Sequence, residues 1–481
     1  MNIKQIARYI GIALIFNAAL MFVSMMVSVF DGMDSAFTPL LISTLVTAMV
    51  GSFPMVFVRV QDDVSLKDGF AITIFAWLLS CIFGMLPYLL WGGPFTLSNA
   101  WFESVSGYTT TGATILADVE SLPKGLVFWR TSTHFIGGMG ILVFMLLVLP
   151  TMSSLRFKIS KIEISSISKD NYKYRFSKTV RVSAVTYLFL ILLQAVLFIL
   201  AGMTPFDAIN HSMSIIATGG FSTKNLSILY YDSVAIEIIC IVFMYISSLH
   251  FGLVYAFFVN RSKALVKSPV FRYFIAFSFV MSVLIALDLK MSGEAAGYAE
   301  AFRLSFFQVS SMVSSTGLAT ADTSVWPLFS IILLLIVMFH GGCSGSTCGA
   351  VKADRVWIVF KVIKNQIIRQ LHPNAIIPVK VHDHTLDMNM VNSAVLYIVL
   401  YTIVFFVGVA LLSMTDMSFM DAVSSSLSSL GNVGPGFDSS NSLGNYDHFH
   451  PFAKFVMTVQ MLLGRLEIYT VLMLFYIFKK S

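Results

Sequence analysis

Ten long apolar runs limit this chain to a helical membrane architecture. A helix needs about 20 apolar residues to cross the hydrocarbon layer, whereas a transmembrane strand alternates over about ten. The runs are Ile6–Phe30, Ala36–Val58, Phe70–Trp91, Leu126–Leu149, Val182–Met203, Val234–Val259, Tyr273–Leu289, Val325–His340, Val391–Met414 and Phe452–Phe478. Only 12% of the 481 residues are charged, roughly half the share of a soluble domain. We therefore expect an all-α membrane protein with ten transmembrane helices.

The first run could instead belong to a cleaved secretory signal, because Lys4 and Arg8 form a basic start. The apolar core of a signal spans about 7 to 15 residues and ends at a small-x-small cleavage site. Ile6–Phe30 is longer than that, and no such site precedes Asp31. We interpret it as a retained helix that forms an N-terminal hairpin with the second run.

Basic residues predict the orientation of the chain, since Lys and Arg in short loops mark the cytoplasmic side. With the N-terminus inside, the inner loops hold 24 of the 31 Lys and Arg residues. The outer loops collect acids such as Asp118, Glu120 and Asp322. The net charge of +6 thus reflects topology and gives no sign of nucleic-acid binding. Because ten crossings is an even number, we expect both termini in the cytoplasm.

No soluble domain is left over between the spans. The longest inner segments, Thr151–Arg181 and Lys352–Asn389, are basic and weakly patterned. They are long enough to contact a cytoplasmic partner and too short to fold alone as an enzyme. A membrane enzyme would need convergent His, Asp or Glu within the spans, and the acids lie almost wholly in loops. We expect no enzymatic activity.

A short polar segment built around glycine occurs four times on the outer side, between a half-length stretch and a long apolar run. Its central glycines, Gly112, Gly219, Gly317 and Gly434, are 107, 98 and 117 residues apart (219−112, 317−219, 434−317). The half-length stretches before them are Asn99–Tyr108, Asp207–Ile216, Phe302–Ser314 and Asp421–Leu430. We interpret the chain as an N-terminal hairpin (1–66) followed by four pseudo-repeats of helix, pore half-helix, filter and helix around one central pore. The repeats cover 67–152, 178–260, 270–370 and 388–481.

The repeated segment has the chemistry of an ion filter. Non-helical backbone at membrane depth is tolerated only where it lines water or is buried in protein. Rings of carbonyl oxygens can replace the water around an alkali cation, and glycine permits positive φ and close backbone approach. Half-helices would aim their negative ends at the cavity below. The candidate filter residues are Thr110, Thr111, Gly112, Ala217, Thr218, Gly219, Ser315, Thr316, Gly317, Asn432, Val433 and Gly434.

The alternative for each segment is a helix C-cap in an ordinary outer loop. Four occurrences in the same context, each between a half-helix and a full span, favour the filter. The hydroxyl groups of Thr110, Thr111 and Thr218 could bond neighbouring backbone and hold the extended segment open. Asn432-Val433 stands where the other segments have a threonine beside the glycine, so we expect the ring to be only pseudo-symmetric.

A glycine-rich loop follows the outgoing run of the third repeat. It consists of Gly341, Gly342, Cys343, Ser344, Gly345, Ser346, Thr347, Cys348 and Gly349. The loop lacks the Gly-Lys-Ser/Thr ending of a phosphate-binding loop and follows no strand, so we expect no nucleotide on this chain. We predict a flexible constriction of the pore, with a packing kink between helices as the alternative. A disulfide or metal site at Cys343 and Cys348 is disfavoured near the reducing inner side.

Arg465 lies within the final run, where a fixed charge costs about 2.5 kcal/mol or more. It therefore needs acceptors inside the protein, and the uncapped carbonyls of Gly341–Gly349 are suitable. Glu467, two residues on, points away from Arg465 on a helix and is a poor partner. We hypothesise that Arg465 holds the glycine-rich loop across the pore and repels cations there. A purely structural arginine is the alternative.

Three further polar sites have simpler interpretations. Glu103, on the first half-helix, could bind the ion, but we favour a role in holding that helix by hydrogen bonds. Arg130, near the outer end of its span, is interpreted as a structural anchor. The triplet His382-Asp383-His384 could bind a metal, but a solvated polar turn is favoured.

With these motifs, the chain resembles the TrkH/KtrB superfamily of potassium transporters, and the TrkH type in particular, over essentially its whole length. The four central glycines match that family's filter glycines, and the hairpin Ile6–Val58 is typical of the TrkH type. The other matching motifs are Trp129-Arg130 with Gly137-Gly138-Met139-Gly140, the loop Gly341–Gly349, His372-Pro373-Asn374-Ala375 and Gly464-Arg465-Leu466-Glu467. Thr151–Arg181 matches no particular family pattern.

The resemblance implies potassium uptake across the plasma membrane, the inner membrane of a bacterium, through a K+-selective filter gated by the glycine-rich loop. It implies K+ as the transported ion and the only metal, a homodimer, and a cytoplasmic ring of TrkA-like nucleotide-binding subunits. In related plant proteins a serine at the first filter glycine admits sodium, so Gly112 favours potassium. The alternative is a K+ symporter coupled to Na+ or H+. Such transporters usually have two inverted repeats, whereas these four run parallel.

Overall fold

The computed structural model describes residues 2–58, 66–140, 176–372, 377–381 and 384–473. Most of this part of the chain is α-helix. The extended pairing within it is one short antiparallel ladder, of β1 (Lys380–Val381) with β2 (His384–Thr385). The predicted all-α class is thereby confirmed. Of the triplet considered for metal binding, His382 and Asp383 lie outside the described residues.

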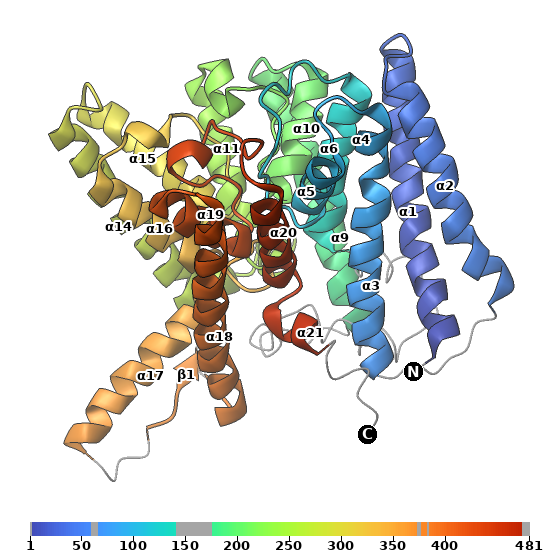
Figure 1. The fold of residues 1–481 in the computed structure, drawn as a ribbon. Coiled ribbons are helices and arrows are strands. Elements are labelled where there is room, and N and C mark those ends of the chain that lie inside the picture. The colour runs from blue at the N-terminus through green and yellow to red at the C-terminus, as the bar shows by residue number, and fades with distance from the viewer. Residues whose placement is uncertain (1, 59–65, 141–175, 373–376, 382–383, 474–481) are drawn as a thin grey trace.

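Two long helices form a hairpin at one edge of the molecule, blue in Figure 1. They are α1 (Ile3–Phe30) and α2 (Phe37–Phe57). The two backbones meet at Gly11 and Gly51, where a Cβ on Gly11 would lie 2.5 Å from the carbonyl oxygen of Gly51. Small residues allow such close helix contacts in membranes. Since α1 also packs on α3 and α6, it joins the hairpin to the body.

After the hairpin, the same order of helices occurs four times: a long helix, a half-helix, a loop and an outgoing helix. The long helices are α3 (Leu66–Gly84), α9 (Phe176–Leu200), α14 (Pro269–Ser292) and α18 (Met388–Leu412). The half-helices are α5 (Leu97–Tyr108), α10 (Pro205–Ile216), α15 (Tyr298–Val313) and α19 (Phe419–Gly431). The outgoing helices are α6 (Lys124–Met139), α11 (Val234–Ser247), α16 (Leu328–His340) and α20 (Pro451–Arg465).

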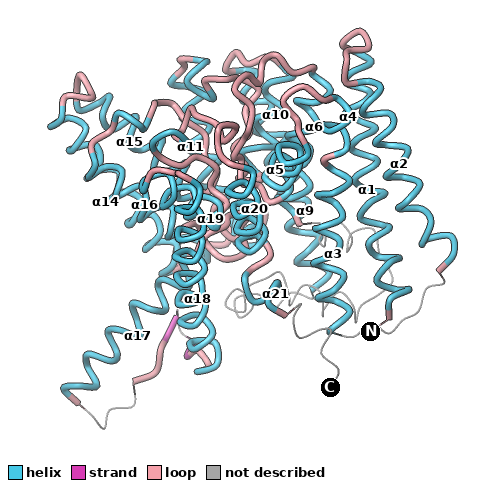
Figure 2. Tube along the Cα trace, viewed as in Figure 1, coloured by secondary structure: helices cyan, strands magenta, loops and turns pink. Residues whose placement is uncertain are grey.

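Shorter elements complete the described chain. They are α4 (Leu86–Trp91), α12 (Phe251–Phe258), α13 (Ala264–Lys267), α17 (Ala353–Leu371), α21 (Ile468–Leu472), and the 3-10 turns η2 (Ser227–Tyr231), η3 (Thr323–Val325), η4 (Ser413–Thr415) and η5 (Asp438–Ser440). Figure 2 shows the connecting loops running through the middle of the molecule as well as along its upper side. Loops in the interior are unusual because their backbone polar groups need partners.

Six helices in the described ranges are long and apolar enough to span a membrane, or seven if the bent pair α11–α12 counts as one span. The six are Ile3–Phe30, Phe37–Phe57, Lys67–Trp91, Val182–Leu200, Pro269–Ser292 and Met388–Thr415. The prediction of several apolar membrane helices is confirmed. The count of ten stays a prediction.

The outgoing helices are shorter than the apolar runs predict. They have 16, 14, 13 and 15 residues, which is less than the roughly 20 that a full crossing needs. A residue with positive φ directly follows two of them, Gly140 after α6 and Gly341 after α16, and Glu467 has positive φ two residues after α20. The fourth, α11, turns by 111° into α12, and His250 caps the new helix by accepting from the Gly252 N–H. The prediction of one unbroken helix for each run is therefore wrong for Val234–Val259 and Phe452–Phe478. Of the run Leu126–Leu149, residues 141–149 lie outside the described range.

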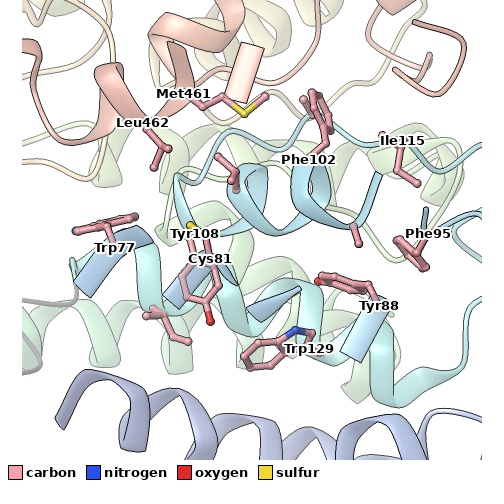
Figure 3. Close-up of a cluster of buried hydrophobic side chains, with 14 of the residues drawn as sticks. Trp77, Cys81, Tyr88, Phe95, Phe102, Tyr108, Ile115, Trp129, Met461 and Leu462 are labelled. Carbon is pink, nitrogen blue, oxygen red and sulfur yellow. The ribbon is translucent and has the colours of Figure 1, made fainter. Parts of the chain in front are cut away.

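The first half-helix, α5, is packed against α3, α6 and α20. Figure 3 shows Tyr108 at its end, near Cys81 of α3 and Trp129 of α6, with Met461 and Leu462 of α20 on the other side. The Tyr108 hydroxyl also donates to Asn17 of α1 at 3.1 Å. The end of α5 is thus held by helices from both ends of the chain.

Candidate functional site

All four half-helices end in the same backbone conformation. One or two residues past each end stands a residue that has positive φ although it is not glycine: 51° at Thr110, 56° at Thr218, 55° at Ser315 and 52° at Asn432. In α5, the N–H groups of Thr110 and Thr111 bond back to the carbonyls of Gly107 (3.0 Å) and Ser106 (2.9 Å). The other three helices repeat this pair of bonds. This is the Schellman motif, so the helix C-cap considered as an alternative is present at every segment.

Two residues after each of these positions stands a glycine with positive φ: 81° at Gly112, 88° at Gly220, 76° at Gly317 and 106° at Gly434. We call these four the ring glycines, because each faces a carbonyl of the next segment. A Cβ added to Gly112 would lie 2.0 Å from the carbonyl oxygen of Gly219, and one added to Gly220 would lie 2.0 Å from that of Thr316. A Cβ on Gly317 would lie 2.0 Å from the carbonyl oxygen of Val433, and one on Gly434 would lie 2.5 Å from that of Thr111. The contacts run from segment one to two, three, four and back to one, so the segments close into a ring.

This geometry corrects the predicted register of the second segment. Gly219 is the counterpart of Thr111, Thr316 and Val433 in the other segments. Like theirs, its N–H donates to the carbonyl five residues earlier, which here is that of Ser214. Gly220 is the counterpart of Gly112. The spacings between ring glycines are therefore 108, 97 and 117 residues (220−112, 317−220, 434−317). Ala217 is the C-cap residue of α10 and precedes the ring.

A cavity of about 90 Å³ opens on one side of the ring. All four ring glycines line it, together with the loops after α5, α10 and α19. Acidic Asp118 lies next to these loops, where the Asn225 side chain donates to its carboxylate at 2.8 Å. That hydrogen bond lowers the pKa of Asp118, so the carboxylate stays charged near neutral pH.

A buried ion pair braces the first and second segments. Arg130 Nε donates to Glu103 at 2.7 Å, and both side chains are about fully buried. Glu103 also accepts from the Thr114 hydroxyl (3.0 Å) and the Ile115 N–H (3.1 Å). The Arg130 guanidinium lies 4.0 Å from the centre of the Phe221 ring. The predictions that Glu103 holds its helix by hydrogen bonds and that Arg130 is an anchor fit these contacts, but the sequence did not indicate that they pair.

The predicted filter side chains behave differently from one another. Thr218 donates its hydroxyl to the carbonyl of Ala217 at 2.7 Å, and Thr111 bonds the Thr109 hydroxyl at 2.8 Å. The hydroxyl of Thr110 is buried without a partner, as is that of Ser315. Backbone and glycines, more than hydroxyl bonds, therefore shape the ring.

The glycine-rich loop lies against the C-terminal ends of the half-helices. The Thr347 hydroxyl donates to the carbonyl of Ile216 at 3.1 Å, and Cys348 Sγ donates to that of Ser314 at 3.0 Å. A Cβ on Gly349 would lie 2.3 Å from the carbonyl oxygen of Gly431. The loop therefore contacts α10, α15 and α19 where their chains enter the ring. Both cysteines of the loop are buried free thiols.

The break between α11 and α12 holds the other side of this loop. The Cys343 N–H donates to the carbonyl of Ser248 at 2.8 Å, and the Phe251 N–H donates to that of Gly345 at 3.2 Å. His250 lies so close that its ring would be 2.3 Å from a Cβ on Gly345. The broken second outgoing helix thus supplies backbone partners that an unbroken helix would have used internally.

Arg465, the last residue of α20, contacts the loop as the sequence predicts. Its Nη1 donates to the carbonyl of Thr347 at 2.5 Å, and its Nη2 donates to that of Gly137 at the end of α6. The single helix predicted for the final run ends at this residue, because α20 covers only Pro451–Arg465. The second acceptor, Gly137, was not predicted.

A second charged contact lies close by. Glu467 accepts from Arg355 at 2.9 Å and from Lys352 at 3.3 Å. Both cations belong to the chain just after the glycine-rich loop, and Arg355 stacks 3.7 Å from the centre of the Tyr397 ring. Sequence reasoning missed this cluster. An acid in an apolar run was the available signal, since a buried charge needs a counter-ion.

The donor set fits a weakly held monovalent cation better than a transition metal. In the described ranges no group of three or more His, Cys, Asp or Glu side chains is placed to hold a metal ion. Where the segments converge, the ring offers backbone carbonyl oxygens instead. Such oxygens can replace the hydration shell of an alkali ion.

Comparison with known proteins gives one consistent family. The family model described as TrkH, cation transport protein, matches residues 40–481. The Trk system potassium uptake protein TrkH of Escherichia coli K12 is 33% identical over 480 residues, 99% of each chain. TrkH of Vibrio parahaemolyticus is 34% identical over 482 residues, 98% of each chain. The crystal structure of that potassium transporter matches with a TM-score of 0.88, 33% identity and all of both chains covered.

Proposed function

The chain belongs to the TrkH family of cation transport proteins, and on this premise we propose that it takes up potassium across a membrane. The family consists of transporters, not enzymes. Relatives that share a third of its sequence over their whole length are named as potassium uptake proteins. Potassium is the transported ion and the metal that the site holds.

One observation carries the proposal: four chain segments close into a ring in which each glycine faces a carbonyl of the next segment. A side chain at these positions would collide with backbone, so the ring can form only around glycine. We assign the K+ filter to the ring glycines Gly112, Gly220, Gly317 and Gly434 together with the residues before them, Thr110–Thr111, Ala217–Gly219, Ser315–Thr316 and Asn432–Val433. The half-helices point their negative ends at the ion below the filter.

The glycine-rich loop Gly341–Gly349 acts as the gate of this pore. Its contacts with Ile216, Ser314 and Gly431 support a position across the conduction path, directly inside the filter. Arg465 holds the loop through the carbonyl of Thr347 and adds a positive charge that repels cations. We call this contact the Arg465 latch.

Ten crossings in four parallel pseudo-repeats form the pore, with boundaries at 67–152, 178–260, 270–370 and 388–481, after the hairpin 1–66. The four equivalent helix caps support this division. Both termini are cytoplasmic, and the protein lies in the inner membrane of a bacterium. In support, the start of α1 and helix α21 lie on the same side of the molecule, away from the outer loops (Figure 1).

The transporter works as a homodimer under a cytoplasmic ring of TrkA-like nucleotide-binding subunits. Helix α17 is the described element best placed to transmit their motion. It begins at Ala353, directly after the glycine-rich loop, and extends away from the bundle (Figure 1). Its exposed apolar side chains Phe360, Ile363 and Ile367 leave a face for a protein contact. The nucleotide binds the partner, and neither chain needs nucleic acid.

Flux measured in liposomes tests this function against the alternative, K+ symport with Na+ or H+. Purified protein is reconstituted into potassium-loaded liposomes, and uptake of a radioactive rubidium tracer is followed without any sodium or proton gradient. We expect uptake that added potassium suppresses and added sodium does not. Strict dependence on a sodium or proton gradient would support the symporter, and absence of any cation flux would contradict both.

A further inference from the structure

Asn432 is the one residue of the four equivalent cap positions that bonds a neighbouring segment. Thr218 uses its hydroxyl on its own backbone, and the hydroxyls of Thr110 and Ser315 are buried without partners. The carboxamide of Asn432 is longer by one heavy-atom bond. It reaches from segment four to segment one, at the junction where the last repeat meets the first.

The Asn432 carboxamide makes two hydrogen bonds with the same nitrogen. Its Nδ2 donates to the Thr111 hydroxyl oxygen at 3.0 Å and to the carbonyl of Met461 in α20 at 2.9 Å. Because a carbonyl can only accept, the Met461 contact fixes which end of the amide points there. Oδ1 therefore points elsewhere, and it is buried without a hydrogen-bond partner.

These bonds continue as a chain into the first half-helix. Thr111 accepts from Asn432, so its own hydroxyl hydrogen is available to Thr109 at 2.8 Å. Thr109 in turn donates to the carbonyl of Val105 in α5 at 2.7 Å. Segment three has the matching Thr316–Ser314 pair at 2.7 Å, but the cap residue facing it, Thr218, donates to its own chain. The connected chain is thus specific to the junction of segments four and one.

The unpartnered oxygen of Asn432 faces the proposed gate. A Cβ on Gly349, in the glycine-rich loop, would lie 2.9 Å from Oδ1, and a Cβ on Gly464, next to Arg465, would lie 2.8 Å from it. Leaving a buried acceptor without a donor is unfavourable, and the two hydrogen bonds of Nδ2 hold Oδ1 in this position. Asn432 thereby contacts Thr111 of the ring on one side, and on the other side it lies against the glycine-rich loop at Gly349 and against α20 at Gly464, next to Arg465.

We propose that Asn432 is a positioning residue for ion selectivity, which sets the separation of Thr111 and Gly434 where the ring closes. Gly434 packs on the carbonyl of Thr111, the residue whose side chain Asn432 holds. Movement of Gly349 with the loop changes the packing of Asn432 and so the ring. This inference rests on the proposed function, because it names a selectivity residue within the same filter.

The test compares potassium with sodium in the liposome assay for Asn432→Ser, Thr111→Val and the double variant. Asn432→Ser places in segment four the residue that segment three carries. Because each single change removes the same hydrogen bond, we expect each to lower potassium-over-sodium discrimination by about two- to tenfold. The double variant should lose no more than the worse single one. Thr458→Ala is the control: it removes a buried hydroxyl of α20 that lies outside the proposed filter and the glycine-rich loop, so it should keep wild-type discrimination.

Heat stability of each purified variant is measured alongside, because a purely structural role would lower stability and leave selectivity unchanged. Asn432→Leu, which keeps about the same size and removes both N–H donors without adding a charge, replaces Asn432→Ser if that variant does not fold. Wild-type selectivity in folded variants, or a double variant that loses the product of the two single effects, would overturn the inference. A wild-type protein without potassium preference would instead contradict the proposed function, before any variant is compared.

Discussion

Glu467 and Arg355 form an ion pair of 2.9 Å between the break after α20 and the first turn of α17. The side chains are largely buried, at 15% and 6% exposure. Lys352 joins the pair at 3.3 Å, and both Lys352 and Glu467 have positive φ. The segment that leaves the glycine-rich loop is therefore bound to the same helix break that carries Arg465. Any force that moves α17 must act against this pair.

Glu467→Gln tests the pair. Removing one partner leaves Arg355 buried without its counter-charge, so we expect a loss of about 3–5 kcal/mol in the free energy of unfolding. Potassium flux without the cytoplasmic partner should rise, since α17 is freed from the α20–α21 break. Asp31→Asn is the control, because its pair with Lys124 is exposed and contributes at most about 1 kcal/mol. Thermal unfolding and liposome flux that match this control would show that the pair does not restrain the gate.

Gly220, not Gly219, should be the residue of its segment that tolerates no side chain. A Cβ on Gly220 meets the backbone carbonyl of Thr316 at 2.0 Å, whereas one on Gly219 meets the His134 ring at 2.3 Å. A backbone collision has no simple relief, but a side-chain collision does. We expect Gly220→Ala to reduce potassium-over-sodium selectivity, as Gly112→Ser should, while Gly219→Ala combined with His134→Ala keeps it. If the Gly220→Ala variant still selects potassium over sodium, Gly219 and not Gly220 would be the filter glycine of its segment.

Arg130→Met should destabilise the protein by about 3–5 kcal/mol, because it leaves the Glu103 carboxylate buried without a counter-charge. Combining it with Glu103→Leu should restore much of this stability, since an apolar pair of similar size avoids the buried charge. Potassium-over-sodium selectivity should stay below wild type in this double variant, because Thr114 and Ile115 lack the acceptor that Glu103 provides. Thermal unfolding and ion competition on the double variant separate the two roles. Recovered selectivity would make Glu103 a structural residue alone.

The half-helices could be predicted from sequence because their starts and ends carry local signals. Thr204 and Ser418 cap α10 and α19 by accepting from the N–H groups of Asp207 and Asp421, as such residues commonly do. The register of segment two could not be predicted in the same way. Gly219 and Gly220 are adjacent and both permissive, and only contact with Thr316, a residue of another segment, distinguishes them.

The breaks in the outgoing helices could not be predicted from the sequence for a different reason. Hydropathy reports that a run is apolar, but it does not report that Ser248 gives its carbonyl to Cys343 instead of to its own helix. The acceptor at Thr347 could be anticipated because a charge at Arg465 needs one. The pair of Glu467 with Arg355 joins residues 112 positions apart, a distance that no local pattern covers.

The proposed topology predicts which surface residues a membrane-impermeant thiol reagent can reach from outside. Single cysteines in a background without Cys81, Cys240, Cys343 and Cys348 would be placed at four highly exposed positions: Ile3 (70%), Phe30 (89%), Met291 (87%) and Leu371 (75%). We expect external labelling at Phe30 and Met291 only, because this topology places the α1–α2 turn and the end of α14 on the outer side. External labelling of Ile3 or Leu371 would contradict cytoplasmic termini and the four parallel repeats.

Arg465 gives the most direct test of gating, because its two functions can be separated. The guanidinium joins two carbonyls at once, those of Thr347 and Gly137, and under the proposed function it would also place a positive charge in the conduction path. Arg465→Ala removes both, so potassium flux in liposomes without the cytoplasmic partner should rise. Arg465→Lys keeps the charge, but a single ammonium lacks the fork that reaches both acceptors.

If the latch closes the pore mechanically, the lysine variant should conduct nearly as well as the alanine variant. If repulsion closes it, the lysine variant should stay near wild type, with flux that rises with ionic strength as the charge is screened. Thr458→Ala, on the same helix, is the control. Its hydroxyl accepts from Trp101 and donates within α20, away from the loop, so its flux should stay unchanged. Folded Arg465→Ala protein with wild-type or lower flux would rule out both forms of the latch, because neither allows a closed pore without this side chain.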